Sequence, residues 1–89
     1  MHAMVGRSTI HDAERGRAFL RESIPRIKQA PGFVSGNWVM LGEDSGTSML
    51  IFESEGAARA AVEQLKANLP PSDVVTIDTI EIGEVVEQA

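Results

Sequence analysis

The chain has 89 residues, a formal net charge of −5 and no cysteine, so it holds one domain over residues 1–89 without disulfides or thiolate metal sites. A fold of this length buries only about 60% of the surface of its unfolded chain, and such small domains commonly need a partner subunit. The acidic total argues against a nucleic acid partner, and no apolar run reaches the ~20 residues of a membrane span. With two histidines and no visible signal peptide, we expect no metal and, by default, a cytoplasmic location.

The first two predicted elements are a strand and a helix. Residues 2–10 are predicted to form a short strand, and Asp12 is placed to cap the helix that follows. Apolar residues then recur at helical spacing, which predicts a helix over residues 12–23. Because Pro25 removes one backbone hydrogen bond, we expect a kink or a fresh helical turn at residues 25–29.

A hairpin, a second helix and a long strand are predicted in the remainder of the chain. Residues 43–46 have the composition of a hairpin turn, and Ser54 is placed to cap the second helix. The predicted bounds are 33–42 and 47–54 for the hairpin strands, 55–69 for the helix and 74–86 for the last strand. This order predicts a ferredoxin-like βαββαβ fold of the α+β class, in which both helices cover one face of a four-stranded antiparallel sheet.

Both faces of the predicted sheet are apolar. Trp38–Leu41 and Met49–Phe52 are apolar at consecutive positions, and consecutive residues of a strand point to opposite faces. Two helices cover only one face, so the second face needs another partner. A homodimer that packs sheet against sheet into an α/β barrel provides this cover. The alternative is a monomer that uses its apolar sheet face to bind another molecule.

Three segments carry a resemblance to a known family. They are Pro25 late in the first helix, Ala30-Pro31-Gly32-Phe33 before the second strand, and Met49–Ser54 leading into the Ala-rich helix that begins at Glu55. The pattern resembles the dimeric α/β-barrel superfamily, in its antibiotic-biosynthesis-monooxygenase-like branch. The resemblance implies a pocket between the sheet and the helices. It also implies cofactor-independent oxidation of aromatic polyketide substrates or, in another branch, haem degradation.

The residues that distinguish these activities are only partly present. In the haem-degrading branch the reaction depends on an Asn on the first strand, a Trp on the third strand and a later His. Here Phe52 stands where that Trp would lie, and no histidine follows His11, so haem degradation is not expected. Polyketide oxygenases use an Asn and a Trp with a Tyr. This chain has Asn37 and Trp38 but no tyrosine, and these two neighbours point to opposite faces.

Six residues are the candidates for a site that binds a small aromatic molecule without a cofactor or metal. They are Asn37 and His2 for catalysis, and Trp38, Phe52, Ser35 and Met40 for substrate binding. A buried Asn needs hydrogen-bond partners that a ligand can supply, and a neutral imidazole can move a proton near pH 7. The alternative for Trp38 is packing in the core or the dimer interface, and the alternative for His2 is a frayed terminus.

Two further interpretations stay open. Residues 1–30 contain six basic and three acidic residues, whereas residues 31–89 contain two basic and ten acidic residues. The arginines of the first helix either lie on its solvent-exposed face or bind an acidic partner. The second interpretation concerns activity, because the same dimer could bind a ligand or serve as an accessory protein without catalysis.

Overall fold

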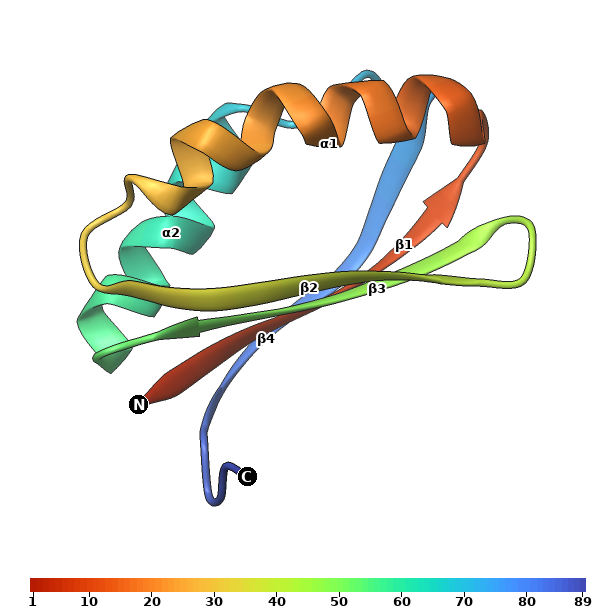
Figure 1. The fold of residues 1–89 in the computed structure, drawn as a ribbon. Coiled ribbons are helices and arrows are strands. Elements are labelled where there is room, and N and C mark those ends of the chain that lie inside the picture. Colours follow the sequence, from red (N-terminus) through yellow and green to blue (C-terminus); the bar gives the residue numbers. More distant parts are fainter.

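The six elements follow the predicted order. A computed structural model describes all residues 1–89 (Figure 1). Its elements are β1 (His2–Ile10), α1 (Ala13–Lys28), β2 (Phe33–Leu41), β3 (Ser45–Phe52), α2 (Glu55–Ala67) and β4 (Val75–Glu84).

The four strands form one antiparallel sheet, in the order β2-β3-β1-β4. Both helices lie on the same side of this sheet, as Figure 1 shows. The predicted ferredoxin-like fold is therefore confirmed. Neither helix is long and apolar enough to cross a bilayer.

The helical turn predicted at residues 25–29 is present, but the predicted end of the first helix at residue 23 is wrong, because α1 continues through Pro25 to Lys28. Asp12 caps this helix as predicted, accepting a hydrogen bond of 3.1 Å from the backbone N–H of Arg15. Pro25 is exposed and removes only its own N–H from the helix. Ile27 packs against the core, so tertiary contacts hold the last turn despite the missing hydrogen bond.

The remaining boundaries differ from the prediction by one or two residues. The hairpin turn is tighter than expected because Gly42 adopts a φ of +71°, which lets β3 begin at Ser45. Ser54 caps α2 as predicted, since its hydroxyl accepts a hydrogen bond of 3.1 Å from the N–H of Ala57.

The hydrophobic core lies between α2 and the sheet. Its buried residues are Met4, Leu50, Phe52, Ala58 and Val62. Phe52 is completely buried, and its ring meets that of Phe33 edge to face, with 5.8 Å between the centroids. The core therefore joins β1, β3 and α2, while α1 contributes less to it.

The opposite face of the sheet carries apolar side chains in contact with solvent. Val5, Val39 and Met49 come from three neighbouring strands and are 37%, 47% and 46% exposed. Leu41 at the end of β2 is 53% exposed. We call these four residues the apolar sheet face. Its composition matches the prediction that both faces of the sheet are apolar.

Replacing Gly32 with alanine is expected to lower the free energy of unfolding by about 1–3 kcal/mol. Gly32 has a φ of +78°, and an added Cβ would lie 2.8 Å from the Cβ of Ala57. Gly56→Ala is the matched control, since alanine there has no atom closer than Ser54 Oγ at 4.0 Å and favours the helix. Urea denaturation measures the free energy of unfolding of both variants, and an equal loss in Gly32→Ala and Gly56→Ala would contradict the expectation.

Candidate active-site cavity

A cavity of about 590 Å³ lies between the two helices and the sheet. Of the 28 residues that line it, 15 are hydrophobic. This volume and this apolar character are typical of sites for small organic ligands. Phe19, Leu20 and Ile27 of α1 line the cavity without filling the space between this helix and the sheet.

The sheet supplies one wall of the cavity and the helices supply the others. Met4, Trp38, Ser48 and Leu50 come from β1, β2 and β3, and Leu20 comes from α1. Strand alternation explains this set, because residues at even positions of these strands point toward the helices. The cavity is therefore a site for an apolar molecule in contact with hydroxyl groups.

The indole of Trp38 lies along β2 because residue 36 is a glycine. A Cβ on Gly36 would lie 3.0 Å from Cη2 of Trp38 and 3.3 Å from Cγ of Leu50. Glycine leaves the space in which the indole packs against the floor of the cavity. The half-buried indole offers a planar surface on which an aromatic ligand can stack.

The structure separates the six predicted site residues. Trp38 and Met40 line the cavity. Asn37 and Ser35 are exposed and pair with Met49 and Ile51, on the face of the sheet that points away from the helices. Phe52 is buried in the core, and it does not line the cavity. The catalytic roles predicted for Asn37 and His2 stay predictions.

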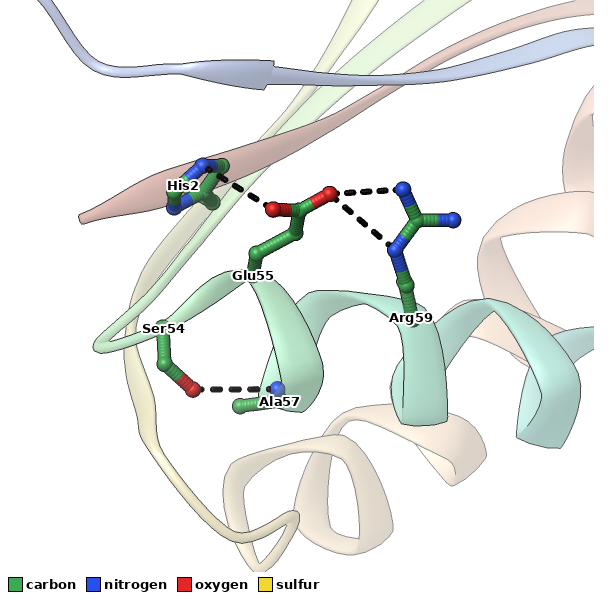
Figure 2. Close-up of polar contacts among 5 residues, drawn as sticks. All are labelled: His2, Ser54, Glu55, Ala57 and Arg59. Carbon is green, nitrogen blue, oxygen red and sulfur yellow. Dashed lines mark hydrogen bonds and ion pairs between the residues drawn. The ribbon is translucent and has the colours of Figure 1, made fainter.

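His2 is the first residue of β1 and lies next to the beginning of α2 (Figure 2). Its Nε2 is 3.9 Å from Oε2 of Glu55, and its buried Nδ1 has no hydrogen-bond partner. Glu55 also accepts hydrogen bonds from Nη2 and Nε of Arg59, at 2.6 Å and 3.1 Å. The hydrogen bond from Arg59 is the main reason that the pKa of Glu55 is lowered, and the charge of Arg59 adds to it. None of the three side chains lines the cavity.

Replacing Glu55 with glutamine is expected to make stability less dependent on acid pH. Because its pKa is lower in the folded chain, the Glu55 carboxylate stabilises the fold above its unfolded pKa. That contribution is lost as the pH falls through the lowered folded pKa. Urea denaturation at successive acid pH values measures the slope. Glu63→Gln is the control, because Glu63 on the same helix has only a looser pair, at 3.9 Å from Lys66. A slope unchanged in Glu55→Gln would contradict the expectation.

Sequence reasoning missed the polar residues that the helices add to the cavity. Ser23, Arg17 and Arg26 come from α1, and Gln64 and Asn68 come from α2 and its C-cap. These residues share no short motif, since the fold brings them together from two helices. The helical periodicity of α1 was the one available signal, because it places Gly16, Leu20 and Ser23 on the face turned to the sheet.

The chemistry available in the cavity is binding and orientation. Its lining contains hydroxyl, amide and guanidinium groups but no carboxylate and no imidazole. The structure has no group of three or more His, Cys, Asp or Glu side chains placed to hold a metal ion. A mainly apolar cavity of this kind displaces water from the surface of a bound molecule and orients it.

Comparison with known proteins shows the fold. No protein-family model matches the chain, and no curated protein matches it. Solved structures match the chain. A mutant form of SnoaB from Streptomyces nogalater, a cofactor-independent oxygenase, is 19% identical to it and superposes with a TM-score of 0.74. The match covers 98% of this chain and 94% of that one.

Two further structures share the fold. The haem degrader MhuD from Mycobacterium tuberculosis, with two haems in its active site, is 18% identical with a TM-score of 0.62, and the match covers 100% of this chain and 99% of that one. A dimeric ferredoxin-like protein from an uncultured marine organism is 12% identical with a TM-score of 0.62, over 100% of this chain and 98% of that one. The chain therefore has the ferredoxin-like fold that the resemblance to antibiotic-biosynthesis monooxygenases implies.

Proposed function

We propose that this protein is a homodimeric, cofactor-independent oxygenase of the cytoplasm. It oxidises a small aromatic molecule, polyketide- or quinol-like, in the cavity between the sheet and the helices. The observation that carries the proposal is the mainly apolar cavity of about 590 Å³ bordered by the single tryptophan. The fold that the chain shares with SnoaB, a cofactor-independent oxygenase, supports it.

Oxygenation without a cofactor requires the substrate to supply the electrons. A deprotonated phenol or enol transfers them to O2, and the protein contributes orientation and exclusion of water. With an anthrone, one atom of O2 becomes the new carbonyl oxygen. The other atom leaves as water with the two hydrogens of the oxidised methylene. Trp38 and Met40 hold the aromatic rings in this proposal.

Haem is a less suitable ligand for this cavity than a metal-free aromatic molecule. Haem iron in proteins is commonly held by a histidine, a cysteine, a tyrosine or a methionine. The chain has no cysteine or tyrosine, and neither of its two histidines lines the cavity. The methionines Met4 and Met40 that line it serve here as apolar wall.

Oxygen uptake with a panel of anthrones and quinols tests the oxygenase. We expect uptake above the buffer rate, reduced in Trp38→Ala and retained in Val86→Ala, since Val86 is 85% exposed and does not line the cavity. No uptake above buffer with any substrate would refute the enzymatic proposal.

The second candidate is a ligand-binding or accessory dimer without catalysis. The absence of carboxylate and imidazole groups from the cavity favours it, because no side chain there can act as a general base near neutral pH. It predicts that aromatic ligands quench the fluorescence of Trp38 while oxygen uptake stays at the buffer rate. Turnover of any substrate in the panel would exclude it.

A further inference from the structure

The charged residues that line the cavity are of one sign. Arg17 and Arg26 of α1 are the only charged side chains among them. The chain as a whole contains 13 acidic residues against eight basic ones, yet no Asp or Glu lines the cavity. The cavity is therefore positive in a protein that is otherwise acidic.

Both guanidiniums are free to bind a ligand. Of the other four arginines, Arg15 contacts Asp73 at 3.1 Å and Arg59 contacts Glu55 at 2.6 Å, whereas Arg7 and Arg21 are unpaired but do not line the cavity. Arg17 and Arg26 make no ion pair and no side-chain hydrogen bond in the structure. Both arginines are solvent-exposed and border the cavity, where the adjacent apolar surface strengthens the attraction between a guanidinium and an anion.

The two arginines lie toward opposite ends of α1. They are nine residues apart, which corresponds to about 14 Å along the helix. Near Arg26, Ile27 and Ala30 pack against the hydrophobic core, and the carbonyl end of the helix opposes an anion. Near Arg17, the cavity is lined by the small residues Ala13 and Gly16. The end at Arg17 is therefore the better place for an anionic group.

We propose that the molecule bound in this cavity is an aromatic acid, whose planar rings lie against Trp38 and whose carboxylate pairs with Arg17. Arg26 adds to the positive potential of the cavity from the other end of α1. This inference rests on the proposed function of the cavity as the site of an aromatic ligand, and it adds the chemical class of that ligand. A guanidinium binds a carboxylate through two parallel N–H donors, which also fixes the orientation of the rings.

Two probes of the same shape and different charge test this proposal. Anthraquinone-2-carboxylate and anthraquinone-2-carboxamide differ in the charge of one substituent, and calorimetry measures their dissociation constants with the full-length protein. We expect the acid to bind about tenfold more tightly than the amide, an advantage that shrinks as salt is added. Equal affinities would overturn the proposal while leaving the cavity as an aromatic site. Failure of both probes to bind would overturn the proposed function together with this inference.

Three arginine-to-glutamine variants test which arginine pairs with the carboxylate of the ligand. We expect Arg17→Gln to remove most of the preference for the acid by weakening binding of the acid far more than binding of the amide. Arg26→Gln should reduce the preference by a smaller factor. Arg21→Gln is the matched control, because Arg21 is exposed on the same helix like Arg17 and Arg26 but does not line the cavity. Preference retained in Arg17→Gln, or lost equally in Arg21→Gln, would overturn the assignment. Thermal unfolding of each variant verifies that it is folded.

Discussion

Replacing Val5 with aspartate is expected to convert the proposed homodimer into a monomer. Val5 is 37% exposed at the apolar sheet face, together with Val39, Leu41 and Met49, and unlike Val39 it does not border the cavity. In the proposed homodimer this face packs against the same face of a second copy, and the substitution would bury an unpaired carboxylate there. Burying an isolated charge costs several kcal/mol, which exceeds what a small interface can offset. Light scattering after gel filtration should show the mass fall from twice 9.6 kDa to 9.6 kDa.

Val86→Asp is the matched control for this experiment. It makes the same chemical change at a residue that is 85% exposed and lies beyond the end of β4. The control should keep the mass of the dimer, since its carboxylate stays in water. A wild-type mass of 9.6 kDa at micromolar concentration would contradict the sheet-to-sheet dimer, as would an unchanged dimer in Val5→Asp.

The fold could be predicted because its signals are local. Asp12 and Ser54 cap the two helices as their sequence contexts indicate, and strand alternation placed Trp38 and Asn37 on opposite faces. The prediction that the first helix ends before Pro25 was wrong, because the tendency of proline to end a helix was weaker than the packing of the last helical turn. The packing of Ile27 against the core keeps α1 helical beyond the proline.

The cavity was less predictable than the fold, because distant residues form it. Trp38 and Met40 could be assigned to one face from β2 alone. Whether that face borders a cavity or a filled core depends on how closely α1 approaches the sheet, which no short segment encodes. Arg17 and Arg26 are solvent-exposed, as the helical pattern indicates, and only the folded chain shows that they also border the cavity.

Replacing Phe52 with alanine is expected to lower the free energy of unfolding by about 3–5 kcal/mol. Phe52 is completely buried, and it contacts the ring of Phe33 in the core shared by β1, β3 and α2. The substitution removes this ring contact and leaves a space that a compact core cannot close. Small domains have about 5–15 kcal/mol of stability in total, so the variant should unfold at much lower urea concentrations than the wild type.

Phe19→Ala separates a structural role of Phe52 from a role in ligand binding. Phe19 is half-buried on α1 and lines the cavity, whereas Phe52 does not. Alanine at residue 19 should cost less stability than alanine at residue 52 and should weaken the binding of anthraquinone-2-carboxamide. Phe52→Leu should keep both most of the stability and the affinity, since leucine fills much of the same space. A Phe52→Leu variant that keeps its stability but binds the ligand more weakly would show that Phe52 contacts the ligand. That result would support the substrate-binding role predicted for Phe52 from the sequence.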